Sequence, residues 1–218
     1  MPKKLKPYPI HRHDEMNQNW PSKTQTGGIF QTGKKPKCII ITGRPGSGKT
    51  TLTGELCKRM YLPKISRDEI KEGYVNTFGV KHDHLSKDTN GRVNEVFFET
   101  ILNLLKGNVS ILVEAAFQHK LWDLVVPRIN EIALTYIIVC ELGAEISAKR
   151  HLERGLADPN REFYHGDKRV VIFRETGEFE PGGEYIPPEY DLPTLQVSTI
   201  DGYMPSLEEI VKFVMNAE

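Results

Sequence analysis

The stretch Gly43-Arg-Pro-Gly-Ser-Gly-Lys-Thr50 decides the fold of this chain. It matches the pattern G-x-x-x-x-G-K-[ST], which acts as a phosphate-binding loop when it joins a strand to a helix. The flanking residues meet this condition, because Cys38–Thr42 is apolar and β-branched and Thr50–Met60 has a helical composition. By chance, the pattern arises in on the order of one in a hundred chains of this length. The stretch therefore predicts a site for the phosphates of a nucleotide.

The residue types of the loop fit the chemistry of a polyphosphate. Glycines let successive backbone N–H groups point inward, and the following helix adds the positive end of its dipole. The ammonium of Lys49 is expected to bridge the β- and γ-phosphates, and the hydroxyl of Thr50 to bind magnesium. The loop residues predicted to hold the nucleotide are Gly43, Arg44, Pro45, Gly46, Ser47, Gly48, Lys49, Thr50 and Thr51.

Apolar strands alternate with helical segments along the rest of the chain. Besides Cys38–Thr42, strands are predicted at 62–66, 110–113, 134–141 and 195–199. Helices are predicted at 93–106, 121–133, Ala144–Arg154, 168–174 and behind a capping box of Ser206 and Glu209. Pro127 either kinks the second of these helices or lies in the first turn of a later one. The alternation predicts a three-layer α/β/α domain with a five-stranded parallel sheet.

Composition and charge exclude several classes of protein. The chain has 218 residues, and 29 lysines and arginines balance 29 aspartates and glutamates. This balance argues against a bulk electrostatic binder of nucleic acid or anionic membrane. The apolar runs are too short to span a membrane, and the N-terminus lacks the apolar region of a secretory signal. The three cysteines lie in apolar stretches, which indicates reduced thiols and a cytoplasmic location.

The N-terminal residues differ from the rest of the chain. Residues 1–37 contain eight lysines and arginines against two acidic residues, together with five prolines. We predict a basic N-terminal arm over 1–36, followed by the nucleotide-binding domain over 37–218. The arm either is solvated or contacts phosphate or substrate, and the sequence leaves both alternatives open.

A polar cluster after the second strand narrows the class of nucleotide protein. The chain has no Asn-Lys-x-Asp guanine signature, and it has no room for the large helical lid domain of an assembly-forming ATPase. Ser66-Arg-Asp68-Glu69 ends the strand at 62–66, and the carboxyl ends of strands in an open sheet face the ligand. The carboxylate of Asp68 can orient an acceptor hydroxyl, or it can cap the next helix.

These residues resemble the P-loop kinases of the group that contains polynucleotide 5′-kinase, zeta toxins and chloramphenicol phosphotransferase. The resemblance extends from Lys37 to near the C-terminus and is carried by Gly43–Thr51, 65–70, 111–117, Arg150 with Arg154, and Thr199–Tyr203. It implies a kinase-type lid, ATP and Mg²⁺ as cofactors, and transfer of the γ-phosphate to a hydroxyl group. It also implies that Asp68 is the base that accepts the proton of that hydroxyl.

Glu114 ends the strand that carries the second acidic position of such kinases. Many P-loop proteins hold magnesium through an aspartate here, and this chain has a side chain one methylene longer. Four roles stay open for Glu114: it holds the water shell of the metal, binds a substrate hydroxyl, shares the base role with Asp68, or is purely structural. Gln118 and His119 follow in a loop and are candidates for the acceptor pocket.

The segments Ala144–Arg154 and 156–165 look like the lid of these kinases. The lid has to bring cations over the transferring phosphoryl group, because charge builds on its oxygens. We assign Arg150 to nucleotide binding and Arg154 and Arg161 to catalysis, with surface ion pairs as the alternative for each. Gly155 is expected to end the helix and serve as a hinge. Thr199–Tyr203 resembles the segment that borders adenine, or is a turn that enters the last helix.

The acceptor cannot be assigned from the residues alone. We favour a hydroxyl group of a small molecule as the acceptor, with a nucleotide sugar or a polynucleotide 5′ end as the alternatives. The balanced net charge of the chain argues against the polynucleotide. A function of another class also fits the sequence, namely that of a nucleotide-gated binding or regulatory protein. His82-Asp-His84 is metal-capable but has no ligand pair of recognisable spacing, so we read it as a surface or substrate-region loop.

Overall fold

The computed structural model describes residues 34–218 except 167, 180, 182, 217 and 218. The chain divides into two units, Met1–Lys34 and Lys35–Glu218, and the description below concerns the second. The predicted basic arm lies almost wholly outside the described residues. Its boundary and both of its expected roles therefore stay predictions.

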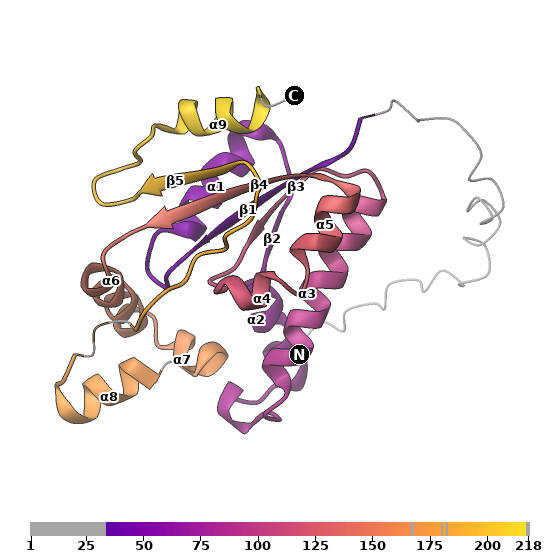
Figure 1. The fold of residues 1–218 in the computed structure, drawn as a ribbon. Coiled ribbons are helices and arrows are strands. Elements are labelled where there is room, and N and C mark those ends of the chain that lie inside the picture. Colours follow the sequence, from indigo (N-terminus) through magenta and orange to yellow (C-terminus); the bar gives the residue numbers. More distant parts are fainter. Residues whose placement is uncertain (1–33, 167, 180, 182, 217–218) are drawn as a thin grey trace, which may run out of the picture. The chain divides into compact units, whose positions relative to one another are not determined.

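A parallel sheet forms the centre of the second unit (Figure 1). Its five strands lie in the order β2-β3-β1-β4-β5. Their bounds are Lys37–Gly43 for β1, Lys64–Ser66 for β2, Ile111–Glu114 for β3, Leu134–Glu141 for β4 and Thr194–Ser198 for β5. The register aligns Ile41 of β1 with Glu114 of β3, and Gly43 with Cys140 of β4. The carboxyl ends of the central strands thus meet beside the phosphate-binding loop.

Helices cover both faces of the sheet, which confirms the predicted three-layer α/β/α P-loop fold (Figure 1). On one face α3 and α5 pack, and on the other α1 and α9. The helices are α1 (Lys49–Met60), α2 (Arg67–Phe78), α3 (Thr89–Lys106), α4 (His119–Trp122), α5 (Val126–Ile132), α6 (Ala144–Ala157), α7 (Asn160–His165), α8 (Lys168–Thr176) and α9 (Leu207–Met215), with a 3-10 turn, η2 (His82–His84).

The continuous apolar run of β1 explains why this strand is central. Cys38 and Ile40 pack into the core beneath α3 and α5, whereas Ile39 and Ile41 pack beneath α1 and α9. All four side chains are fully buried. A strand with both faces buried needs apolar residues at every position rather than at alternate ones. The phosphate-binding loop therefore extends from a strand that is buried on both faces of the sheet.

The structure differs from the sequence predictions at two helices. The expected helix stop at Gly155 is wrong, because α6 continues to Ala157 and Gly155 is buried within it, and its role as a hinge stays a prediction. Leu152, three residues earlier, is also buried, so Gly155 lies on the buried face of the helix. The segment 121–133 divides into α4 and α5, and Pro127 lies in the first turn of α5. The proline thus starts a helix, as one of its two expected roles required.

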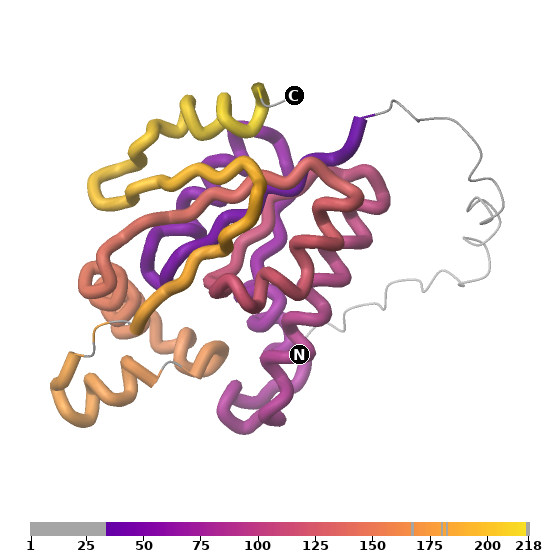
Figure 2. Tube along the Cα trace, in the orientation of Figure 1, coloured from indigo at the N-terminus to yellow at the C-terminus, as the bar shows by residue number. Residues whose placement is uncertain are grey.

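The segment after α8 returns across the carboxyl ends of the strands before it enters β5 (orange in Figure 2). Here it is called the strap, defined as residues 183–190. The backbone N–H of His119 donates to the Ile186 carbonyl at 3.0 Å, and the Glu189 N–H donates to Nδ1 of His119 at 3.1 Å. These contacts hold the strap against the loop that follows β3.

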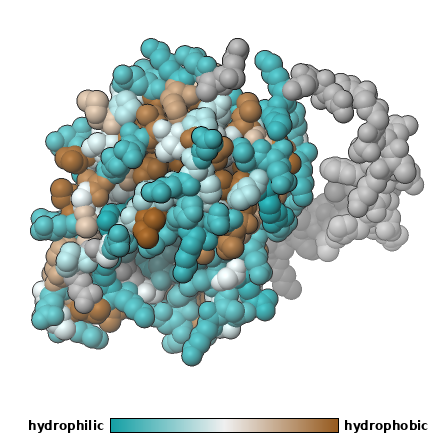
Figure 3. Space-filling model, viewed as in Figure 1, coloured by the Kyte–Doolittle hydropathy of each residue, from teal (hydrophilic) through white to brown (hydrophobic). Residues whose placement is uncertain are grey.

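The face of the molecule seen in Figure 3 is largely hydrophilic, with apolar side chains scattered among polar ones. Across the described part of the chain, no helix is both long enough and apolar enough to cross a membrane.

Candidate active site

A cavity of about 540 Å³ lies between the carboxyl ends of the strands and the helices α6, α7 and α8. Most of the residues that the sequence predicted for the site line it together. These are Pro45, Gly46, Gly48, Lys49, Thr50, Thr51, Asp68, Glu114, Arg154 and Arg161. The structure adds residues to which the sequence analysis gave no individual role, namely Ser66, Glu69, Glu72, Ala116, His151, His165, Gly166, Lys168 and Arg169. Acids therefore line the side formed by α2 and β3, and cations line the lid side.

The phosphate-binding loop has a backbone that only glycine adopts easily. Gly46 and Gly48 have φ values of 85° and 82°. A Cβ on Gly46 would lie 2.0 Å from the Ser147 carbonyl oxygen of α6, so the loop and the lid helix are in backbone contact there. The hydroxyl of Ser47 is buried and has no hydrogen-bond partner among the described residues. The loop thus contains a polar atom that its own surroundings leave unsatisfied.

Lys49 lies across this loop. Its Nζ donates to the Arg44 carbonyl at 2.7 Å, and only 6% of the residue is exposed. Burial lowers the pKa of Lys49, and the carboxylates of Glu114 and Asp68 act in the opposite direction. An ammonium with so little water around it binds a phosphate oxygen strongly.

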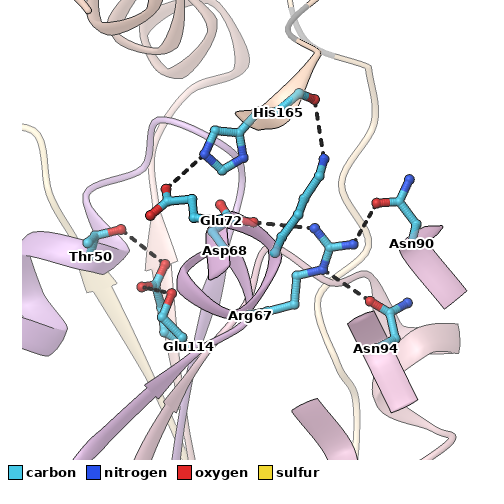
Figure 4. A network of polar contacts seen from close by, with 10 residues as sticks. Thr50, Arg67, Asp68, Glu72, Asn90, Asn94, Glu114 and His165 are labelled. Atoms are coloured by element: carbon cyan, nitrogen blue, oxygen red, sulfur yellow. Dashed lines mark hydrogen bonds and ion pairs between the residues drawn. The ribbon is translucent and has the colours of Figure 1, made fainter. Parts of the chain in front are cut away.

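Thr50 and Glu114 meet at the position predicted for magnesium (Figure 4). The Thr50 hydroxyl donates to Oε1 of Glu114 at 3.1 Å, and the Ser66 hydroxyl approaches Oε2 at 3.4 Å. Burial and the charge of Asp68 raise the pKa of Glu114. A hydroxyl beside a buried carboxylate is the oxygen donor set that Mg²⁺ prefers, so these residues fit the ion.

The protein alone supplies few ligands for a metal. Within the described ranges, no group of three or more His, Cys, Asp and Glu side chains could hold a metal ion. A magnesium ion at Thr50 and Glu114 would therefore take its remaining ligands from phosphate oxygens and water, as is usual for nucleotide-bound Mg²⁺.

Asp68 lies in the first turn of α2 and faces the cavity. The alternative role as a helix cap is wrong, because Ser66 takes the N-cap position and the helix begins at Arg67. The side chain of Asp68 is 56% exposed. Partial burial favours the neutral acid, but His165 in its protonated form and the guanidinium of Arg67 outweigh it and hold the pKa of Asp68 below its usual value. The group is therefore an ionised carboxylate at neutral pH.

Arg67 is a site residue that sequence reasoning missed. Its Nε donates to Oδ1 of Asn94 at 3.1 Å, and its Nη2 donates to Oδ1 of Asn90 at 2.8 Å (Figure 4). Its Nη1 lies 3.5 Å from Oδ1 of Asp68, and only 13% of the side chain is exposed. Two amides one turn apart on α3 thus fix the cation that neighbours Asp68.

The lid helix α7 is tied to α2 by polar contacts. Nε2 of His165 lies 2.9 Å from Oε1 of Glu72, and Nζ of Lys71 donates to the His165 carbonyl at 3.3 Å. Glu162 accepts from Lys81 at 2.5 Å. His82–His84, which we read as a substrate-region loop, lies next to Lys81, and the side chain of Asp83 lies close to Gly166 at the end of α7. These contacts bring the lid over Asp68.

The three lid arginines differ in position. Arg154 and Arg161 line the cavity, and Nε of Arg161 is buried with no hydrogen-bond partner in the described part of the chain. Arg150 lies outside this cavity and donates to the carbonyls of Thr199 and Ile200 at 3.0 and 2.9 Å. The nucleotide contact of Arg150 stays a prediction, and its observed role is to hold the segment 199–203.

The segment 199–203 also contacts the phosphate-binding loop. The Thr199 hydroxyl donates to the Ser47 carbonyl at 2.9 Å. A cavity of about 360 Å³ lies beside it, between Arg44, the turn after β4, Tyr185 and Ile200. The segment is therefore in position to border a nucleotide base, as the resemblance implies, and that role stays a prediction.

A family model described as AAA domain matches residues 38–168. Among solved structures, a candidate kinase from Chloroflexus aurantiacus is 22% identical, with 85% of this chain and 100% of that chain covered and a TM-score of 0.68. The APS kinase of Mycobacterium tuberculosis, solved with AMPPNP and APS, is 14% identical, with coverage of 83% and 98% and a TM-score of 0.54. A sugar kinase from Janibacter is 13% identical, with coverage of 83% and 95% and a TM-score of 0.53. These likenesses concern the fold. No curated protein matches the chain.

Proposed function

The chain belongs to the AAA domain family, and from this premise we propose that it is a kinase that transfers the γ-phosphate of ATP to a hydroxyl group of a small-molecule acceptor. One observation carries the proposal: Lys49 and Thr50 of the phosphate-binding loop line the same cavity as the carboxylates of Asp68 and Glu114. A triphosphate on the loop would direct its last phosphate toward these acids.

In this proposal, the phosphate-binding loop and the pair of Thr50 and Glu114 bind the nucleotide with its metal ion. The loop N–H groups and the Lys49 ammonium hold the β- and γ-phosphates, and Thr50 and Glu114 hold Mg²⁺. When bound, this ion neutralises part of the charge on the phosphates. We include a reducing, cytoplasmic location in the proposal, because Cys38, Cys57 and Cys140 are all free thiols.

Asp68 acts as the base. An ionised carboxylate that faces the cavity can accept the proton of the acceptor hydroxyl as its oxygen attacks the γ-phosphate. Glu114 is less suited to this role, because hydroxyls of Thr50 and Ser66 already approach both of its oxygens. Burial raises the pKa of Glu114, and a cation beside it would favour the ionised form, so Glu114 is better placed to hold the metal.

The lid supplies cations and excludes water. Arg161 reaches the cavity with an unsatisfied Nε, and Arg154 lines the same wall. Guanidinium groups here stabilise the charge that builds on the transferring phosphoryl oxygens. The contacts of α7 with α2 keep the lid near Asp68, which limits attack by water on ATP.

The test measures ADP release from ATP and Mg²⁺ with a panel of metabolite alcohols, nucleotide sugars and oligonucleotides. We expect one class of acceptor to stimulate release at least tenfold. Lys49→Ala should abolish nucleotide binding, and Asp68→Asn should bind ATP but lose at least 100-fold of the stimulated rate. Asp191→Asn, at an exposed site outside the cavity, is the matched control. Tight ATP binding without stimulation by any acceptor would instead indicate a nucleotide-gated binding protein.

A further inference from the structure

A second cavity of about 270 Å³ adjoins the first and is not used by the proposed phosphoryl transfer. We call it the annex. Pro45, Ala116 and Arg169 line both cavities, so the two spaces meet at these residues. Ala116 is exposed and has the smallest side chain of the three, so little side-chain bulk lies at this boundary between the cavities.

The walls of the annex are held by specific contacts. The hydroxyl of Tyr185 donates to the Phe117 carbonyl at 3.1 Å and lies 2.8 Å from Oγ1 of Thr42, at the end of β1. Nε2 of Gln118 approaches the Glu184 carbonyl at 3.5 Å. The strap is thus fastened to the ends of two central strands. The annex is therefore part of the folded site and not a gap beside a loose loop.

Two arginines line the annex, and they differ in whether their guanidinium groups have protein partners. The guanidinium of Arg44 has protein partners. It donates to the Gly183 carbonyl and lies over the Tyr185 ring, 6.0 Å from the ring centroid. Arg169 makes no hydrogen bond or ion pair with any residue in the described ranges. Its helix also carries Arg174, which is paired with Glu162 at 2.7 Å. Arg169 is thus a half-buried cation that lines both cavities and has no partner among the described residues.

A guanidinium in such a place binds a carboxylate or a phosphate group through two parallel hydrogen bonds. Asp68 lines the first cavity and Arg169 lines both, so one acceptor molecule can extend from Asp68 to Arg169. From these features we propose that the acceptor carries an anionic group, a carboxylate or a phosphate, which Arg169 binds in the annex while the acceptor hydroxyl lies at Asp68. The proposal rests on the proposed kinase function and adds its substrate class.

The test uses pairs of alcohols that differ only in the anionic group. Suitable probes are glycerol against glycerate and glycerol 3-phosphate, an aldose against its aldonate, and a nucleoside against its 5′-monophosphate. We expect kcat/KM to favour an anionic member over its neutral partner at least tenfold, and the carboxylate and phosphate members show which group is preferred. In Arg169→Ala this ratio should fall at least tenfold, and Arg169→Lys should restore part of it.

A control variant and a binding measurement separate the alternatives. Arg128→Ala, on α5 outside both cavities, should keep the preference of the unmodified protein. Calorimetry with the same probes, on protein saturated with AMPPNP and Mg²⁺, measures discrimination without turnover. Anionic preference in binding but no turnover would support the annex and overturn the kinase. Turnover without anionic preference, or with a preference that Arg169→Ala retains, would overturn the annex and leave the kinase.

Discussion

Arg67 and Asp68 are adjacent in sequence, and their side chains also meet, with Nη1 of Arg67 3.5 Å from Oδ1 of Asp68. The other guanidinium nitrogens of Arg67 are held by Asn90 and Asn94 of α3. Arg67 therefore acts through Asp68 rather than on the substrate. Its fixed charge stabilises the ionised carboxylate on which the proposed chemistry depends.

Replacing Arg67 should change how the proposed reaction depends on pH. In Arg67→Met the pKa of Asp68 should rise, because the carboxylate loses a positive neighbour but stays partly buried. The acid limb of the kcat/KM profile should then move to higher pH, so the loss of rate is larger at pH 5 than at pH 8. Arg59→Met, which breaks a surface pair with Glu208, is the control. An equal loss at every pH would mean that Arg67 only supports the fold.

The backbone contact between the phosphate-binding loop and α6 leads to a second prediction. Gly46 has a φ of 85°, and a Cβ there would lie 2.0 Å from the Ser147 carbonyl oxygen. Gly46→Ala should therefore displace the loop from the lid helix and weaken ATP binding at least 100-fold, as measured by calorimetry. Gly54→Ala is the matched control, since a Cβ at Gly54 in α1 would meet nothing within 4 Å. This control should keep ATP affinity and raise stability by about 0.5–1 kcal/mol.

The phosphate-binding loop could be predicted to the residue because its signal is local. The glycines, Lys49 and Thr50 have roles that follow from the backbone of a single strand-loop-helix unit. The sheet could be predicted for a similar reason, because continuous apolar runs such as that of β1 mark strands buried on both faces.

Residues whose role depends on distant partners could not be predicted. Arg67 resembles any charged residue at a helix start until α3 supplies Asn90 and Asn94. Gly155 follows a charged helical segment as a stop would, but α6 continues through it and the residue is buried. The annex depends on the strap, which folds over strands that are far from it in sequence. No local sequence pattern therefore predicts that Arg169 lines a cavity.

The contact between Thr50 and Glu114 predicts a specific dependence on magnesium. Glu114→Gln keeps the size of the side chain but removes the negative charge that would attract the ion. The Mg²⁺ concentration for half-maximal ADP release should rise at least tenfold, and removal of the metal with EDTA should abolish release from the unmodified protein. Glu141→Gln, at the exposed end of β4, is the control. An unchanged magnesium requirement in Glu114→Gln would assign Glu114 a structural role.

Lys71 predicts a stability that depends on pH. Its side chain is buried beneath α7, and burial, followed by the charge of Arg67, lowers its pKa to about 8 against 10.5 for the free group. Asp68 and Asp83 oppose this shift without cancelling it. Between about pH 8 and 10.5 the unfolded chain binds the proton that the folded chain has lost, so stability rises with pH across this window. Below pH 8 both states are protonated, and the full cost of burying the ammonium remains.

Lys71→Met should remove this cost. At pH 7 the variant should be more stable by on the order of 2 kcal/mol, because an apolar side chain needs no hydration in this position. In a chain of this size that gain corresponds to a rise in Tm of roughly 4 °C or more. The advantage should shrink as the pH rises from 8 to 10.5, and thermal unfolding at pH 7 and pH 10 measures it. Lys120→Met, at an exposed site in α4, should show no such trend. An advantage of equal size at both pH values would mean that packing, and not the charge of Lys71, accounts for it.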